Sequence, residues 1–299
     1  MSLIIDDSMK PSSLIFNKQC SFCNILKILN YTQLIKIVLH DNNRLGKIVN
    51  GPNISWLRNV HNNNLINCYF NEAMLGEIIA PISIAWLIEP RSIIPHVYAS
   101  IPQIQYKFQY IFTYDDILLQ RDNTKFKLHP AAGIWTQPLD IPPLKNKKCS
   151  FICSSKTMCP MHRFRHEVVK KFEHFVDIYG YYSWVEEKNI GLSDYMFSIA
   201  IENSIEDYYF TEKIMDCFVT YTIPIYCGAK KLEHFFDMQG VIVWNEFVKN
   251  GQIKMLSKEL YENHLPSVIK NRELANKWIS SHQVFDWKYL DLLQQIAPA

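Results

Sequence analysis

Short apolar runs alternate with helical or polar segments along most of this chain, a pattern typical of α/β folds with parallel sheets. In the first half, runs of strand length lie at Leu34–Leu39, Asn67–Phe70, Ile82–Ile88 and Tyr110–Tyr114. Trp56, Leu57 and Val60 stand at helical spacing and predict a short helix over Asn53–Val60. Together these elements predict a first Rossmann-like domain over residues 1–130.

The second half repeats the alternation after a stretch rich in proline and lysine. That stretch predicts a linker over residues 131–148, followed by a second domain over residues 149–299. Strands are expected at Cys149–Cys153, Phe175–Tyr179, Phe197–Ile201, Ile223–Tyr226 and Val241–Trp244. Helices are expected at Pro160–Phe175, from Thr211 onward, at Asn250–His264 and at Pro266–Ser281.

Composition narrows the classes of partner. The 299 residues suit two domains, and the net charge of +2 argues against broad nucleic-acid binding, which needs a basic surface. No apolar run approaches the roughly 18 residues of a membrane span, and the first residues lack the pattern of a signal peptide. We therefore expect a soluble, cytoplasmic protein whose eight cysteines are free thiols.

Two groups of residues have the spacing of zinc ligands, but each is incomplete. Cys20 and Cys23 have no second pair at zinc-finger spacing, and Cys159, His162 and His166 have neither a visible fourth ligand nor a favourable charge nearby. The glycine-rich dinucleotide fingerprint is also absent, which counts against a nicotinamide or flavin enzyme. No metal and no cofactor are expected.

The most informative stretch runs from Phe197 to Gly228 and has the order strand, loop, helix, strand. Glu202 and Asn203 follow its first strand, and Glu212 and Lys213 fall in the first turn of its helix. Ligands of open α/β sheets bind outside the carboxyl ends of the strands, and helix N-termini attract anions. The stretch therefore predicts a site for a phosphorylated ligand rich in hydroxyl groups.

Each of these residues also has an ordinary structural explanation. Lys213 opposes the helix dipole, which suggests an anionic ligand, but it could be a solvated surface lysine. Glu212 suits a helix N-terminus in any case, and Asn203 suits a turn after a strand. Tyr209, just before the helix, could close the pocket or could be loop packing.

Two further candidates lie outside that stretch. Arg163 and Arg165 open a helix that follows a strand end, where arginines could grip a pyrophosphate, or could form surface ion pairs with Glu167. Glu89 ends the apolar run Ile82–Ile88 and could be a general base with a pKa raised by burial, or an exposed glutamate before a proline. The residues alone leave both choices open.

The segment from Tyr195 to Ala229 closely resembles the donor-binding motif of family 10 glycosyltransferases, the α1,3/α1,4-fucosyltransferases, especially bacterial members. The likeness extends to Arg163–Gly180, which is similar to the arginine-bearing helix of the family and the strand after it. Ala85–Pro90 and Phe108–Asp116 are more weakly similar to the segments around the catalytic glutamate.

The resemblance implies the GT-B architecture, in which two Rossmann-like domains face each other across a cleft. It implies that the first domain binds a glycan acceptor and the second binds GDP-fucose or a related nucleotide sugar. Lys213 and one of Arg163 and Arg165 would hold the pyrophosphate, Glu212 the ribose, and Asn203 and Tyr209 would complete the donor pocket.

By the same resemblance, Glu89 would be the general base of an inverting transfer of fucose to an acceptor hydroxyl, with an α1,3-type linkage and without a metal. The chain departs from the family pattern at Met196, where a lysine is usual, so a different nucleotide sugar is one alternative. The other alternative is a nucleotide-sugar or glycan-binding protein that has lost catalysis.

Overall fold

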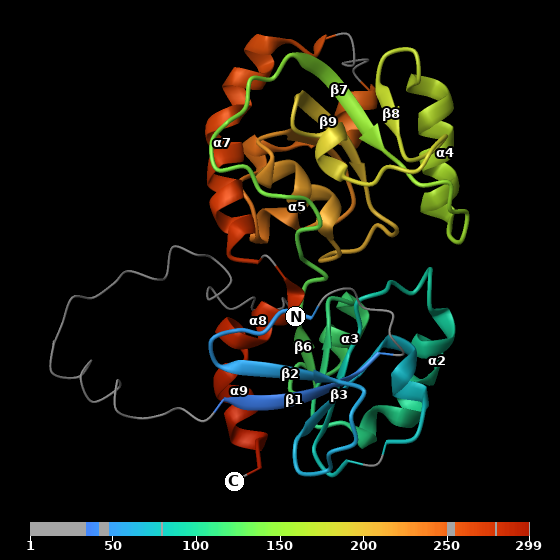
Figure 1. Ribbon diagram of the computed structural model, residues 1–299. Helices are drawn as coiled ribbons and strands as arrows, with labels where there is room; N and C mark the ends of the chain where they lie inside the picture. Colours follow the sequence, from blue (N-terminus) through green and yellow to red (C-terminus); the bar gives the residue numbers. More distant parts are fainter. Residues whose placement is uncertain (1–33, 42–47, 79, 250–254, 279, 299) are drawn as a thin grey trace, which may run out of the picture.

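The structure is a computed structural model that describes residues 34–41, 48–78, 80–249, 255–278 and 280–298. It consists of two α/β domains, one above the other in Figure 1, joined by two crossings of the chain. The possible ligand pair Cys20 and Cys23 lies outside the described residues.

The first domain contains a six-stranded parallel sheet with the strand order β2-β1-β3-β4-β5-β6. Its strands are β1 (Ile35–His40), β2 (Ile54–Arg58), β3 (Ile66–Phe70), β4 (Ser83–Trp86), β5 (Ile111–Thr113) and β6 (Phe126–Leu128). Helix α2 (Pro95–Ile104) follows β4, α3 (Asp116–Arg121) follows β5, and the 3-10 helix η3 (Asn71–Leu75) follows β3. All four strands that the apolar runs predict in this half are present.

The helix predicted over Asn53–Val60 is wrong, because this segment forms β2. Ile54 and Trp56 are buried and pair in parallel register with Ile35 and Ile37 of β1. Burial at alternate positions is the period of a strand, and a segment of only a few apolar residues matches helical and strand spacing equally well. Pairing with β1 decided the outcome.

The second domain has a five-stranded parallel sheet with the order β11-β10-β9-β7-β8. The strands are β7 (Lys147–Ile152), β8 (Asp177–Tyr179), β9 (Tyr195–Ile201), β10 (Ile223–Cys227) and β11 (Ile242–Val243). Helix α4 (Pro160–Phe172) follows β7, α5 (Glu212–Val219) follows β9, and α6 (Trp244–Lys249) follows β11. The five strands, α4 and α5 lie where the sequence predicts them, whereas α6 was not predicted and begins at Trp244, the last residue of a predicted strand.

The strand order reverses direction once in each sheet, between β1 and β3 and between β7 and β9. Such a reversal leaves a crevice outside the carboxyl ends of the two central strands, because the loops that follow them leave in opposite directions. In the second domain the two loops lead to α4 and α5. The fold therefore brings the arginine helix and the Thr211–Lys213 turn to the same edge of one sheet.

The two helices predicted over Asn250–His264 and Pro266–Ser281 are also wrong, because one helix, α7 (Lys258–Asn276), runs through Pro266. Proline removes the hydrogen bond to the carbonyl four residues earlier, here that of Glu262. Both Pro266 and Glu262 are exposed, so water can satisfy this carbonyl. Buried Tyr261 and Val268 hold the helix on either side of the proline.

The end of the chain does not stay with the second domain, contrary to the expected domain of residues 149–299. Helices α8 (Ser281–Lys288) and α9 (Leu290–Ile296) lie beside β1 and β2 of the first domain (Figure 1). Phe285 and Leu293 belong to one buried cluster with Ile37 and Trp86. The C-terminal helices therefore complete the core of the first domain.

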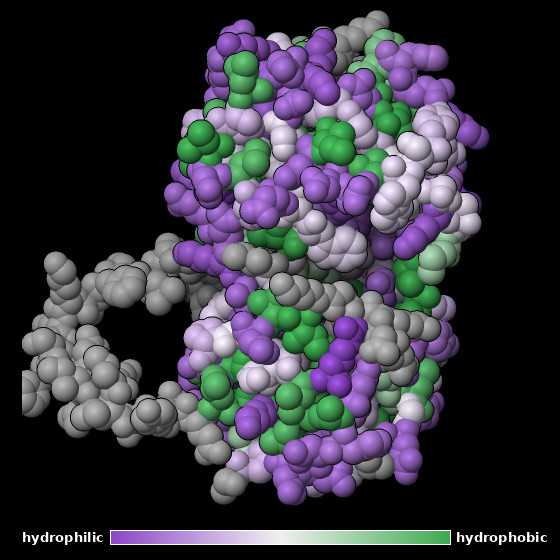
Figure 2. All heavy atoms as spheres, viewed as in Figure 1, coloured by the Kyte–Doolittle hydropathy of each residue, from purple (hydrophilic) through white to green (hydrophobic). Residues whose placement is uncertain are grey.

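The surface seen in Figure 2 is mostly hydrophilic or neutral, with separate hydrophobic patches on both domains. Within the described ranges, no helix is long and apolar enough to cross a membrane.

Candidate active site

Glu202, the residue after β9, is buried with 0% of its surface exposed. One carboxylate oxygen accepts a hydrogen bond from the Thr211 backbone N–H at 2.9 Å, and the other accepts from the Thr211 hydroxyl at 2.6 Å. Burial raises the pKa of this carboxyl, and the nearby Lys213 opposes that rise. Glu202 therefore ties the end of β9 to the start of α5, rather than facing a ligand as its position in the sequence suggested.

Lys213 folds back over the first turn of α5. Its Nζ lies 3.0 Å from the Thr211 hydroxyl, 3.2 Å from Glu212 Oε1 and 3.4 Å from Glu202 Oε2. Thr211 also caps the helix, since its hydroxyl accepts from the Lys213 backbone N–H. The two carboxylates compensate the unfavourable placement of a cation at a helix N-terminus.

Lys188 and Asp216 extend this group of charges and were not predicted. Lys188 Nζ lies 3.5 Å from Glu212 Oε1 and 2.7 Å from Asp216 Oδ2. Although burial alone would raise the pKa of Glu212, Lys213 and Lys188 lower it to about 2. Glu212 is therefore an anion held between two lysines.

The sequence alone could have indicated Asp216 but not Lys188. Asp216 stands four residues after Glu212, hence on the same face of α5. Lys188 is separated from Glu212 by 24 residues, so only the folded chain brings it into contact.

The structure separates the two candidate arginines of α4. Arg165 is 5% exposed, and its NH2 group donates to Asn203 Oδ1 at 2.8 Å. Among the described residues, nothing accepts a hydrogen bond from its buried Nε. Arg163 is exposed, and its NH1 group donates to the Thr157 carbonyl at 3.4 Å. Positions two apart on a helix point to nearly opposite sides, so only Arg165 faces the crevice.

The histidines of α4 serve local structure. His162 accepts from the Met158 backbone N–H through Nδ1 at 3.1 Å, and burial together with Arg165 lowers its pKa to about 4. His166 Nε2 lies 3.2 Å from the Ser154 carbonyl. In the part of the chain that the structure describes, no three His, Cys, Asp or Glu side chains form a group that could hold a metal ion.

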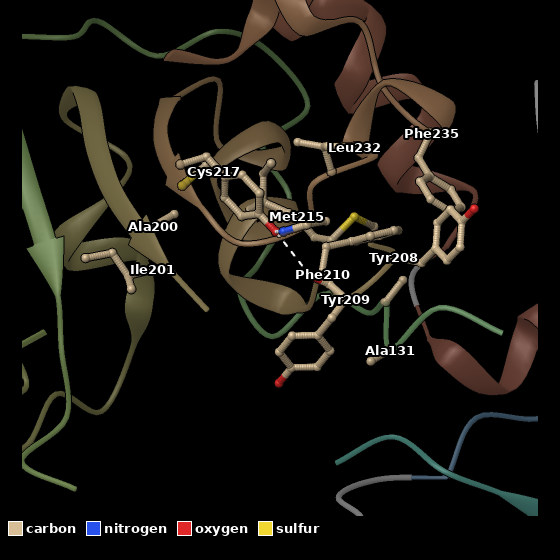
Figure 3. Close-up of a cluster of buried hydrophobic side chains, with 14 of the residues drawn as sticks. Ala131, Ala200, Ile201, Tyr208, Tyr209, Phe210, Met215, Cys217, Leu232 and Phe235 are labelled. Atoms are coloured by element: carbon tan, nitrogen blue, oxygen red, sulfur yellow. Dashed lines mark hydrogen bonds between the residues drawn. The ribbon is translucent and has the colours of Figure 1, made fainter. Parts of the chain in front are cut away.

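Tyr209 is 2% exposed and packs against the first domain, with its ring centroid 4.7 Å from that of Tyr114. Figure 3 shows its hydroxyl directed away from Phe210 and Met215. Tyr208 packs on the other side, against Phe235. Both tyrosines are therefore packed between other side chains and do not form the wall of an open pocket.

Met196 lies near the amino end of β9, whereas the site lies at the carboxyl end. At about 3.3 Å per residue, roughly 16 Å of strand separates Met196 from Ile201. The side chain is partly buried against the core of the second domain. The sequence difference at Met196 therefore gives no support to a changed choice of donor sugar.

Glu89 lies three residues beyond β4, at the carboxyl edge of the first sheet, and is half-buried. Burial raises its pKa, Lys213 opposes the rise, and Glu212 adds to it. Both of these neighbours belong to the second domain. Close by, the Ser92 hydroxyl donates across the domain boundary to the Asn203 carbonyl at 3.4 Å. Glu89 therefore faces the Lys213 group from the opposite domain.

Comparison with known proteins identifies the family of the second domain. Residues 143–284 match the family model described as glycosyltransferase family 10 (fucosyltransferase) C-term. Residues 143–284 are therefore a domain of glycosyltransferase family 10.

Two curated fucosyltransferases match this chain over part of its length. It is 30% identical over 111 residues to the alpha-(1,3)-fucosyltransferase FucT of Helicobacter pylori, covering 35% of this chain and 23% of the relative. It is 30% identical over 77 residues to an alpha-(1,4)-fucosyltransferase of Arabidopsis thaliana, covering 26% and 19%. The matched segments thus span less than a quarter of either relative.

Solved structures match the chain over most of its length. An alpha1,3-fucosyltransferase crystallised with GDP has a TM-score of 0.54 and 15% identity, covering 97% of this chain and 96% of that one. One crystallised with GDP-fucose has a TM-score of 0.52 and 16% identity, covering 87% and 90%. These matches concern the fold, and with the two parallel sheets they confirm the predicted GT-B architecture of two Rossmann-like domains.

Proposed function

We propose that this chain transfers fucose from GDP-fucose to a hydroxyl group of a glycan acceptor, with inversion at the anomeric carbon. The observation that carries the proposal is the contact between the Glu89 loop and the second domain. Ser92 donates to the Asn203 carbonyl, the side chain of Asn203 accepts from Arg165, and Lys213 is close enough to Glu89 to oppose the rise of its pKa. An inverting transferase needs its base on one side of the sugar and the cations that stabilise the leaving diphosphate on the other. The match of residues 143–284 to family 10, described as fucosyltransferase, supports fucose as the sugar and GDP-fucose as the donor.

The second domain would hold the diphosphate of the donor. Lys213 and Arg165 would neutralise the charge that develops as the diphosphate leaves, and the backbone N–H groups at the start of α5 would assist. The buried Nε of Arg165, unpaired among the described residues, suits an anionic acceptor. With this charge compensation, the proposed reaction uses no metal.

Glu89 would act as the general base on the acceptor side. Its carboxylate takes the proton from the acceptor hydroxyl while that oxygen bonds to the anomeric carbon and the bond from this carbon to the diphosphate oxygen breaks. GDP leaves with the electron pair. A raised pKa suits this role, and a positioned base contributes ~10²- to 10⁴-fold to the rate.

An assay with a panel of donors tests the proposal. The wild-type protein is incubated with GDP-fucose, GDP-mannose, GDP-arabinose and UDP-sugars, and donor hydrolysis and transfer to glycans are measured. We expect turnover of GDP-fucose. Turnover confined to a UDP-sugar would refute the assignment of the donor.

A substitution at the base separates an enzyme from a binding protein. Glu89→Gln should reduce kcat by ~10²- to 10⁴-fold while GDP still binds, because the base is lost and the diphosphate site is intact. Glu77→Gln, which changes an exposed glutamate of the same domain, is the matched control and should retain kcat. Full turnover by Glu89→Gln would show that the base is another residue.

A further inference from the structure

The main chain that carries Glu89 continues beyond the hydrogen-bond ladder of its sheet. The last ladder bond on the β5 side runs from the Leu87 N–H to the Phe112 carbonyl, at 2.8 Å. On the other side, β3 ends at Phe70, which pairs with Trp86. The N–H groups of Ile88 and Glu89 therefore have no strand beside them to accept their hydrogen bonds.

Asn71 supplies the missing acceptor through its side chain. Its Oδ1 accepts from the Ile88 N–H at 3.0 Å and from the Glu89 N–H at 3.3 Å. The backbone of Asn71 is left-handed, with a φ of 47°, which turns the chain out of β3 into η3. The side-chain oxygen thus stands where a longer β3 would have placed a carbonyl.

The carbonyl side of Glu89 is held as well. The hydroxyl of Tyr98 donates to the Glu89 carbonyl oxygen at 2.9 Å. The Tyr98 ring lies under the Arg91 guanidinium, 4.5 Å from its central carbon, and Arg91 forms two hydrogen bonds with Asp115 at 2.5 and 2.8 Å. Both peptide groups of Glu89 are therefore fixed by buried side chains.

The Glu89 carboxylate itself has no such hydrogen bonds in the described part of the chain. Among the described residues, no group donates a hydrogen bond to it, and the side chain is half-buried beside the domain boundary. Its position is thus determined by the backbone that carries it and not by partners of its own. A base has to stand within hydrogen-bond reach of the proton it removes, so an error of position is costly.

We propose that Asn71 is a positioning residue for Glu89, which fixes the main chain of the base by accepting the N–H groups of Ile88 and Glu89. This inference rests on the proposed role of Glu89 as the general base. Asparagine meets both requirements of the position, because it tolerates a left-handed backbone and offers a neutral acceptor. Glycine at this position would keep the left-handed backbone but lose the acceptor. Aspartate would keep the acceptor but add a negative charge.

Two substitutions at this position separate positioning from folding. Asn71→Gly removes the acceptor without straining the left-handed backbone, and we expect kcat to fall ~10- to 100-fold while the affinity for GDP is kept. Asn71→Asp retains the acceptor and should keep much of the kcat. Its added charge should move the acidic limb of the kcat profile to higher pH, because a like charge raises the pKa of Glu89.

The matched control is Asn59→Gly. Asn59 is also left-handed, with a φ of 48°, and its side chain also accepts a backbone N–H, that of Asp41 at 3.3 Å. We expect the control to retain kcat even where it lowers the melting temperature. An equal loss of kcat in the Asn59 and Asn71 variants, or wild-type kcat in Asn71→Gly, would overturn the proposal. Should Asn71→Gly fail to fold, Asn71→Asp still tests it.

A measurement without turnover distinguishes this inference from the proposed function. The pKa of the Glu89 carboxyl is followed by carbon-13 NMR, with the signal assigned by its loss in Glu89→Gln. A higher pKa in Asn71→Asp supports the contact between Asn71 and Glu89 even if no GDP-fucose is consumed. An unchanged pKa, in a protein whose turnover depends on Glu89, would reject the inference and leave the proposed function standing.

Discussion

Arg163 and Arg165 lie in different environments, so we expect substitution of Arg165 to weaken nucleotide binding and substitution of Arg163 to have little effect. Arg165 is nearly buried, contacts Asn203 and keeps Nε without an acceptor among the described residues. Arg163 lies on the outer face of the same helix. Replacing each arginine by alanine removes the same kind of side chain, once from the buried face of α4 and once from its exposed face.

The magnitude follows from the hydrogen bonds that a diphosphate would accept. A hydrogen bond between charged groups contributes about 1.5 to 3 kcal/mol, and each 1.4 kcal/mol changes a dissociation constant tenfold. Arg165→Ala should therefore weaken GDP binding by ~10- to 100-fold. Arg165→Lys keeps the charge but loses the forked geometry, so its loss should be smaller than that of alanine.

Titration calorimetry with GDP measures these effects, with the melting temperature of each variant recorded to confirm folding. Arg163→Ala, the matched control, should bind GDP within about twofold of wild type, because an exposed side chain away from the ligand contributes little. Wild-type affinity in Arg165→Ala, or a large loss confined to Arg163→Ala, would refute this assignment of the two arginines.

Three further predictions concern the same site. Lys213→Ala should weaken GDP binding by ~10-fold or more in calorimetry, since it removes a cation from the diphosphate, and unchanged affinity would remove Lys213 from the site. Because the pKa of Glu89 is raised, kcat should begin to fall with decreasing pH above the usual glutamate pKa of about 4.3, since a protonated carboxyl cannot accept a proton. A pH profile of kcat whose acidic limb lies at or below that value would contradict the burial of Glu89. Met196→Lys should leave donor preference unchanged in the donor panel, because the residue lies at the far end of β9, and a switch of donor would show that this end contacts the sugar.

Local pattern was sufficient to predict most of the strands and the capped turn at the start of α5. Apolar runs bounded by polar loops located β1, β3, β4, β9 and β10, because a buried parallel strand requires little more than such a run. The capped turn at Thr211 and the strand end before Glu202 were sufficient to predict an anion site at the edge of a sheet.

Apart from the proline inside α7, the failures discussed above depend on contacts between distant parts of the chain. Strand β2 is defined by its pairing with β1, and α8 leaves the second domain because its apolar face fits the first sheet. Glu202 looked like a ligand-facing carboxylate until its burial under Thr211 was known. The choice between Arg163 and Arg165 required the direction in which α4 presents each side chain.

The most direct test of the account is an experimental structure of the protein with GDP-fucose bound. The account predicts the diphosphate within hydrogen-bond distance of Lys213 Nζ and the Arg165 guanidinium, and the anomeric carbon of fucose facing the Glu89 carboxylate. A nucleotide bound away from Lys213 and Arg165, or a sugar turned away from Glu89, would contradict it.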